Sequence, residues 1–191
     1  MAPVPALAPV VAAAPTPEAM RRLGGALAGV LRPGDTVLLG GDLGAGKTTF
    51  TQGLAAALDV TEPVTSPTFV LVHSYRTGAG WDLLHADVWR LGQLQEVIDL
   101  ALPELLEDGA AVVVEWGERA APALSADCLH VAMDFDGAAP ATAPETAAAD
   151  ARDAAAGERR LVFTSRGASW DGRMAALADA MATAAGASST A

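Results

Sequence analysis

The chain has little of several residue types, and each scarcity narrows what it can be. Its 191 residues include one cysteine, Cys128, which excludes an intramolecular disulfide and a cysteine-based zinc site. This cysteine lies in an apolar run, so we predict a buried, inert thiol in a protein of the reducing cytosol. Basic residues are also few, because 12 Lys and Arg stand against 23 Asp and Glu, for a net charge of −11. Such an acidic chain lacks the basic face needed to bind nucleic acid by itself, so another protein would have to hold any RNA.

Long apolar runs are missing, and no stretch is long enough to span a bilayer. Residues 1–15 are apolar, but no basic residue precedes them and prolines interrupt them, which is unlike a signal peptide. We therefore predict that residues 1–15 form a disordered leader on a soluble, cytoplasmic protein. Residues 137–157 have almost no large apolar side chain, which predicts a flexible insertion.

Lysine is nearly absent, and the only one, Lys47, stands in Gly-Asp-Leu-Gly-Ala-Gly-Lys-Thr (41–48). This sequence fits the phosphate-binding loop pattern G-x-x-x-x-G-K-[ST]. Apolar residues 36–39 before it predict a buried strand, and residues 49–58 after it predict a helix, which is the context the motif requires. Its glycines and backbone N–H groups would form an anion nest, Lys47 would reach the β- and γ-phosphates, and Thr48 would ligate Mg²⁺. These flanks disfavour the alternative of a glycine-rich turn that only caps a core helix.

Helical and strand patterns alternate around this loop, which predicts an α/β fold. We expect a P-loop NTPase-type three-layer fold whose mixed central sheet combines a parallel core with an antiparallel hairpin. The ATPase domain is predicted over residues 16–165, followed by a C-terminal helix and frayed tail over 166–191. The expected helices cover 17–31, 49–58 and 170–183, and residues 91–107 are expected to contain helical turns, the last of them opened by Pro103. The expected strands cover 36–39, 69–75, 81–86, 110–114, 128–135 and 161–164.

Two acids close predicted strands and are candidates for the metal and for water. Glu115 follows the apolar run Val112-Val113-Val114 in a Walker B arrangement, and Asp87 follows residues 83–86. Each would place a carboxylate at a strand end near Thr48 and Mg²⁺. For each, a capping or solvated acid is the alternative, and the sequence leaves open which one binds the metal and which one orients water.

Further residues have both a functional and an ordinary interpretation. His85 could support Asp87, or it could be a packed or surface histidine. Arg90 and Arg119 could contact phosphate or a partner, or they could be solvated. Ser66-Pro67-Thr68 could form a switch segment that senses the γ-phosphate, or it could be an ordinary turn. The four tryptophans are interpreted as core or interface residues.

Asparagine is absent altogether, and this bears on which nucleotide is bound. Guanine specificity in GTPases usually depends on an Asn-Lys-x-Asp motif, so ATP is favoured over GTP. Two other function classes stay open from the residues alone. A small-molecule kinase would be expected to carry an arginine-rich lid, which is not evident before residue 152. A nucleotide-gated interaction module with little hydrolysis would not need both Asp87 and Glu115.

The chain resembles the bacterial TsaE (YjeE) family, small ATPases of tRNA adenosine threonylcarbamoylation, from about Thr16 to Arg119. Four motifs in the family's order carry this resemblance, at 41–50, 64–69, 85–91 and 114–119. The resemblance implies weak ATP hydrolysis by the isolated protein and action with the paralogous TsaB and TsaD proteins, which would involve tRNA indirectly. It also implies that residues 65–68 are switch-like and that Trp116 is an aromatic beside the active site.

The resemblance and the residues together predict ATP and Mg²⁺ as cofactors. In place of the family's usual Phe and Leu-Tyr, Ala86 and Val88-Trp89 flank Asp87, which leaves the acids themselves in place. The predicted catalytic residues are Lys47, Asp87 and Glu115, and the predicted metal ligands are Thr48, Asp87 and Glu115. The predicted nucleotide-binding residues are Gly41, Asp42, Leu43, Gly44, Ala45, Gly46, Lys47, Thr48, Thr49, Ser66 and Thr68.

Overall fold

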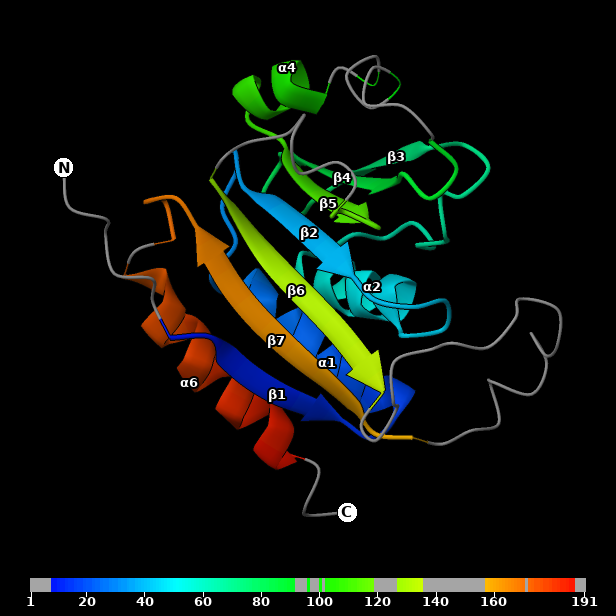
Figure 1. Cartoon of the computed structure of the whole chain (residues 1–191). Helices are drawn as coiled ribbons and strands as arrows, with labels where there is room; N and C mark the ends of the chain where they lie inside the picture. Colours follow the sequence, from blue (N-terminus) through cyan, green and yellow to red (C-terminus); the bar gives the residue numbers. More distant parts are fainter. Residues whose placement is uncertain are drawn as a thin grey trace, which may run out of the picture.

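The computed structural model describes residues 8–91, 96, 100, 102–118, 127–135, 157–170 and 172–187. Within these residues, seven strands form one sheet in the order β1-β7-β6-β2-β5-β4-β3 (Figure 1). The strands are β1 (Val10–Ala14), β2 (Thr36–Gly40), β3 (Val72–Arg76), β4 (Asp82–Asp87), β5 (Ala111–Glu115), β6 (Cys128–Phe135) and β7 (Arg159–Arg166). The helices are α1 (Pro17–Ala28), α2 (Lys47–Ala57), α4 (Leu102–Glu107) and α6 (Arg173–Gly186).

The centre of the sheet is parallel and its two edges are antiparallel. Strands β4, β5, β2 and β6 run parallel, while β3 pairs antiparallel with β4. At the other edge β7 pairs antiparallel with β6, and β1 with β7. All residues of β2 and β5 are buried, as expected of parallel strands covered on both faces. The predicted mixed sheet, including the hairpin of β3 and β4, is confirmed.

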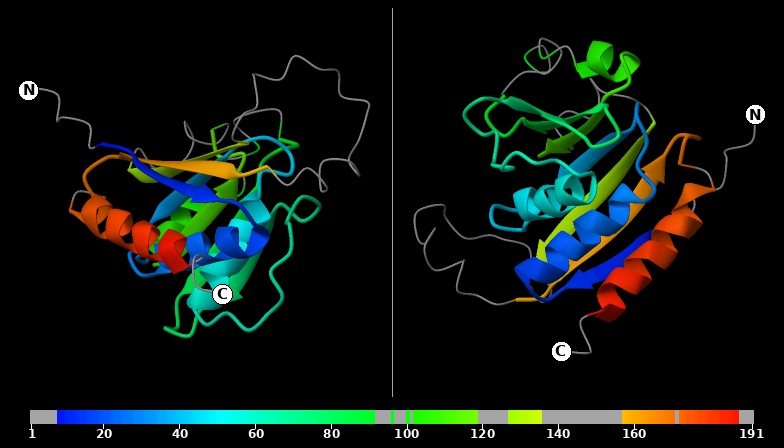
Figure 2. Two further views of the ribbon diagram at one scale, coloured as in Figure 1. Left: turned by 90° about the horizontal axis from the view of Figure 1, so that it is seen from below. Right: turned by 180° about the vertical axis from the view of Figure 1, so that it is seen from behind.

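Helices cover the two faces of the sheet unequally. The larger core lies between one face and the helices α1, α2 and α6, and Figure 2 shows α1 and α6 along that face. Alternate strand residues point the other way, where Leu102 of α4 joins a smaller core with Leu38 and Val112. The predicted three-layer α/β fold is therefore confirmed. No helix among the described residues has both the length and the apolar character needed to cross a membrane.

The expectation of a disordered leader over residues 1–15 is wrong for Val10–Ala14. These residues form β1, which pairs with β7 from Val10 opposite Phe163 to Ala14 opposite Arg159. Ala12 and Ala14 point into the core with 7% and 0% exposure, and Pro9 and Pro15 lie just outside the strand. The inward side chains are small alanines and their outward neighbours are also apolar, so the sequence does not show the alternation of apolar and polar residues that is typical of a half-buried strand. Residues 1–7 lie outside the described residues.

Several predicted boundaries differ from the structure. The strand expected from residue 69 begins at Val72, because residues 67–71 form a turn in which the N–H groups of Val70 and Leu71 donate to the Pro67 carbonyl at 2.9 and 2.7 Å. Phe69 and Val70 are consequently 84% and 63% exposed. The first helix ends at Ala28 and the last begins at Arg173. Except for Gly157, the predicted insertion over 137–157 lies outside the described residues, as does the end of the tail from residue 188.

Candidate functional site

The glycine loop joins the carboxyl end of β2 to the first residue of α2, as the motif predicts. Gly41 and Gly46 have φ of +131° and +106°, values that favour glycine. A Cβ at Gly41 would also lie 2.2 Å from the Met133 carbonyl oxygen, so the close packing of the loop on β6 requires glycine there. Because α2 begins at Lys47, its N-terminal N–H groups and helix dipole favour an anion at this place.

Lys47 is a buried cation within this loop. It is 4% exposed, and its Nζ donates hydrogen bonds to the carbonyls of Gly41 at 2.7 Å and Asp42 at 2.9 Å. Burial lowers the pKa of Lys47, and the attraction of the Glu115 and Asp87 carboxylates offsets only part of this effect. The ammonium group therefore lies in a low-dielectric position where a negatively charged ligand would interact strongly with it.

The indole of Trp116 covers the ammonium group of Lys47. The Nζ atom lies 3.7 Å from the ring centroid, a cation–π contact, and the Trp89 ring lies 4.2 Å from that of Trp116. Trp116 has a φ of +61°, which for a residue other than glycine costs on the order of 1–3 kcal/mol. This backbone conformation directly follows Glu115 at the end of β5, and it belongs to the turn from which the indole reaches Lys47.

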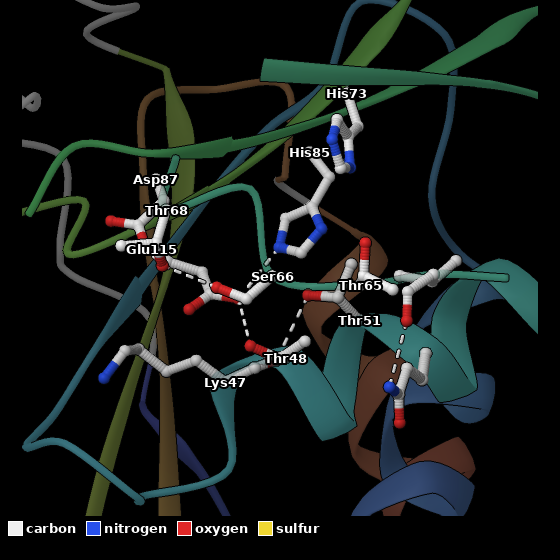
Figure 3. A network of polar contacts seen from close by, with 12 residues as sticks. Lys47, Thr48, Thr51, Thr65, Ser66, Thr68, His73, His85, Asp87 and Glu115 are labelled. Atoms are coloured by element: carbon white, nitrogen blue, oxygen red, sulfur yellow. Dashed lines mark hydrogen bonds and ion pairs between the residues drawn. The ribbon is translucent and has the colours of Figure 1, made fainter. Parts of the chain in front are cut away.

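The two predicted acids lie side by side at the ends of neighbouring parallel strands. Asp87 of β4 is in register with Glu115 of β5, and each residue is 3% exposed. Glu115 Oε1 accepts a hydrogen bond from Thr48 Oγ1 at 2.7 Å and lies 2.8 Å from His85 Nε2 (Figure 3). Glu115 is therefore hydrogen-bonded to the Thr48 hydroxyl, the group that the phosphate-loop motif predicts as a Mg²⁺ ligand.

Asp87 is held by a different set of groups. Its Oδ2 accepts from Thr68 Oγ1 at 2.6 Å, and its Oδ1 accepts from the Trp89 N–H at 2.8 Å. Ser66 Oγ lies 2.7 Å from Thr68 Oγ1 and extends this chain of hydroxyls. The segment from Thr65 to Thr68 therefore contacts a site carboxylate, which is the position that a switch segment would occupy.

One cleft of about 460 Å³ collects most of these residues. Its lining is Leu43, Gly44, Gly46, Lys47, Thr48, Thr49, Ser66, Thr68, Asp87, Trp89, Arg90, Glu115 and Trp116. Three predicted nucleotide-binding residues do not line it. Gly41 and Asp42 instead hold Lys47 through their carbonyls, and Ala45 is fully buried beneath the loop.

The sequence-based interpretation differs from the structure at two residues of this site. Trp89, interpreted as a core or interface residue, lines the cleft, and its position shortly after a strand-end acid was the available signal. Arg90, which the sequence offered as a phosphate or partner contact, also lines the cleft. The hypothesis that His85 supports Asp87 is wrong, because its Nε2 contacts Glu115. The expectation of an aromatic beside the site at Trp116 agrees with the contact on Lys47.

The oxygen atoms in the cleft suit Mg²⁺ better than a softer metal. Within the described part of the chain, no three or more His, Cys, Asp and Glu side chains are grouped to hold a metal ion. The cleft lining includes two carboxylates, from Glu115 and Asp87, and several hydroxyls, of which that of Thr48 bonds Glu115. Mg²⁺ is commonly held by one or two carboxylates with water and substrate phosphates, so the residues present fit that ion.

Comparisons with known proteins identify a family that the chain matches. Residues 14–140 match the family model described as "Threonylcarbamoyl adenosine biosynthesis protein TsaE". A relative from Streptomyces coelicolor, named tRNA threonylcarbamoyladenosine biosynthesis protein TsaE, is 49% identical over 117 residues, which cover 60% of this chain and 78% of the relative. The Bacillus subtilis protein of the same name is 38% identical, covering 61% and 72%. A crystal structure of Bacillus subtilis YdiB aligns with a TM-score of 0.64 and 26% identity, covering 92% of this chain and 95% of that one.

Proposed function

Because the chain belongs to the TsaE family, we propose that it binds and hydrolyses Mg-ATP in support of a complex that makes threonylcarbamoyladenosine in tRNA. One observation carries this proposal. The phosphate-loop residues Lys47 and Thr48 and the strand-end acids Asp87 and Glu115 line a single cleft, although they come from three separate elements. A cation and a helix N-terminus on one side, with two carboxylates on the other, suit a Mg²⁺-bound triphosphate.

The phosphate side of the cleft would bind through the loop. Lys47 Nζ is engaged by two carbonyls of its own loop and by the Trp116 ring. A triphosphate would exchange these weak acceptors for charged oxygens, which form stronger hydrogen bonds with an ammonium group. Mg²⁺ would be held by Thr48 Oγ1 together with a carboxylate, and would supply charge neutralisation on the β- and γ-phosphates.

The contacts support different roles for the two acids. Glu115 is the carboxylate that touches Thr48, at 2.7 Å, so we assign it to the metal side. Asp87 is bonded to Thr68 of the switch-like segment, so we assign it to orienting the attacking water. Water attack on the γ-phosphorus would then release ADP and phosphate, with Asp87 as the acceptor for the water proton.

The acidic charge of the chain supports indirect action on tRNA. With a net charge of −11, the protein has little means of binding RNA by itself. We propose that the TsaB and TsaD proteins are its partners, that they hold the tRNA, and that ATP hydrolysis by this chain supports their turnover.

Phosphate release and ATP affinity, measured on the wild type and on Lys47→Ala, test the proposal. A hydrogen bond to a charged group contributes about 1.5–3 kcal/mol, so affinity should fall by roughly 10- to 150-fold. Arg76→Ala is the control, because Arg76 pairs with Asp82 at 3.0 Å outside the cleft lining and should leave affinity unchanged. Affinity within a factor of about three in Lys47→Ala would contradict the phosphate-loop assignment.

Adding TsaB, TsaD and tRNA to the same assay tests the biological setting. Faster phosphate release with the complete set than with the isolated chain is the expected result. A phosphorylated small-molecule acceptor in place of free phosphate would identify a kinase. ATP binding without phosphate release, under all of these conditions, would identify a nucleotide-gated interaction module.

A further inference from the structure

His85 is a fully buried polar residue that contacts Glu115 but does not itself line the cleft. It lies on β4, two residues before Asp87, and is 0% exposed. Its Nε2 atom is 2.8 Å from Glu115 Oε1. Its Nδ1 atom is also buried and has no hydrogen-bond partner among the described residues. The ring therefore makes one polar contact and leaves a second polar atom unpaired.

Packing alone does not explain a histidine in this position. A buried polar atom without a partner destabilises the folded protein, whereas an apolar side chain of similar size would fill the space without that penalty. His73, its register partner on β3, does not supply the missing contact, because its Nδ1 bonds the Tyr75 hydroxyl at 3.0 Å. The feature that a histidine adds at position 85 is the contact with Glu115.

That contact constrains how the Glu115 carboxylate lies. Oε1 is shared between the Thr48 hydroxyl from α2 and the His85 ring from β4, so two elements fix one oxygen. The other oxygen, Oε2, receives no hydrogen bond from the described residues. The carboxylate is thereby held in one orientation, with Oε2 available to a ligand in the cleft (Figure 3).

We propose that His85 is a positioning residue for Glu115, and that its Nε2–H holds Glu115 in the orientation that serves Mg²⁺. This role depends on the proposed ATPase function. An ionised carboxylate only accepts hydrogen bonds, so the contact requires a proton on Nε2. Because Nδ1 is buried with no acceptor among the described residues, a proton there would be unpaired, and the geometry favours the tautomer with its proton on Nε2. Outer partners of metal ligands commonly act in this way, and their loss costs on the order of 10–100-fold in metal affinity or activity.

The first test compares His85→Leu with His85→Gln. The Gln amide can place an N–H near the position of the imidazole Nε2, whereas Leu removes the donor. His85→Leu should lower single-turnover hydrolysis by roughly 10–100-fold and raise the Mg²⁺ concentration needed for half-maximal rate, while ATP affinity without Mg²⁺ changes less than about twofold. His85→Gln should recover most of the rate. Equal rates in His85→Leu and wild type would overturn the proposal.

The control is His130→Leu, and the melting temperature separates positioning from folding. His130 also has a buried Nε2 without a hydrogen-bond partner, but its neighbouring acid is Glu118, at 3.6 Å, outside the cleft lining. The variant His130→Leu should therefore leave hydrolysis unchanged. In His85→Leu the loss of the bond to Glu115 is offset by the removal of the unpaired Nδ1, so the melting temperature should change little although turnover falls. If His85→Leu lowered both the melting temperature and the turnover, and His85→Gln restored neither, the role of His85 would be structural.

A second test needs no nucleotide. In the protein labelled with ¹⁵N-histidine, the His85 ring, identified by its absence from His85→Gln, should be in the Nε2–H tautomer and should change in Glu115→Ala. An Nδ1–H ring, or one that is insensitive to Glu115→Ala, would overturn the proposal. If the wild type neither binds nor hydrolyses Mg-ATP, the proposed function fails, and this measurement still decides whether His85 holds Glu115.

Discussion

Glu115 and Asp87 are register partners on neighbouring strands, yet different kinds of structure hold them. Both partners of Glu115 come from regular elements, Thr48 from α2 and His85 from β4. The partners of Asp87 are the Thr68 hydroxyl and the Trp89 N–H, both in the loops that flank the β3–β4 hairpin. One carboxylate is therefore fixed by the core of the fold, and the other by connecting segments.

This contrast predicts different mobility on the two sides of the cleft. His85 is fully buried, whereas Ser66 is exposed and Phe69, next to Thr68, is 84% exposed. Segments with few buried contacts open at lower free-energy cost than core strands and helices. The Glu115 side, which we propose binds the metal, should thus be preorganised, while the Asp87 side, which we propose orients water, should depend on the 65–68 segment being in place. A partner protein that stabilised this segment would accelerate hydrolysis without touching the metal side.

The largest expected effect comes from neutralising each acid in turn. Asp87→Asn removes the proposed proton acceptor and should lower turnover by about 10²–10⁴-fold, with the Mg²⁺ requirement unchanged. Glu115→Gln should also lose turnover while still binding ATP, but its half-saturating Mg²⁺ concentration should rise. Phosphate release across a Mg²⁺ titration measures both effects.

The opposite pattern would invert the two assignments. A raised Mg²⁺ requirement in Asp87→Asn, with none in Glu115→Gln, would place the metal on the loop-held side. Unchanged hydrolysis in Glu115→Gln would remove that residue from the mechanism altogether.

A smaller effect is expected from releasing Asp87 without changing it. Thr68→Val removes the 2.6 Å hydrogen bond to Oδ2 at nearly constant shape. Since a bond to a charged group contributes about 1.5–3 kcal/mol, turnover should fall by roughly tenfold or more. Amide hydrogen exchange in residues 65–71 should become faster, while exchange in β5 stays the same. Thr68→Ser keeps the hydroxyl and should behave nearly as the wild type, so equal losses in the two variants would exclude the hydrogen bond as the cause.

The sequence was sufficient to predict the parts of the site that depend on local chemistry. A glycine loop between an apolar strand and a helix specifies its own backbone, and acids directly after apolar runs indicate strand ends. Both carboxylates therefore appeared where the pattern put them. The partner of His85 could not be predicted, because it depends on the β4–β5 register, which sets His85 opposite Val113 and within reach of Glu115.

Two errors in the fold have a common physical origin. Phe69 and Val70 have strong strand propensity, yet tertiary contacts place them in a turn at the Asp87 end of the hairpin, where the Asp87 N–H donates to the Leu71 carbonyl at 3.0 Å. Ala12 and Ala14 have weak strand propensity, yet pairing with β7 makes them a strand. In both places long-range contacts outweighed local preference, and such contacts are not visible in a single sequence.

The smallest expected effect concerns the hydrogen bonds that hold the start of the 65–68 segment. The Tyr75 hydroxyl accepts from the Thr65 N–H at a long 3.4 Å and contacts His73 Nδ1 at 3.0 Å, while Gln52 of α2 donates to the neighbouring Val64 carbonyl at 3.0 Å. Tyr75→Phe should cost about 0.5–1.5 kcal/mol of unfolding free energy, as is usual for one neutral hydrogen bond. Turnover should change less than about twofold, because Gln52 still anchors the segment and Thr68 still bonds Asp87. Urea unfolding and phosphate release measure the two quantities. If Tyr75→Phe lowered turnover as much as Thr68→Val does, the contacts that hold residues 64–65, rather than the Thr68 hydroxyl, would determine where Asp87 lies.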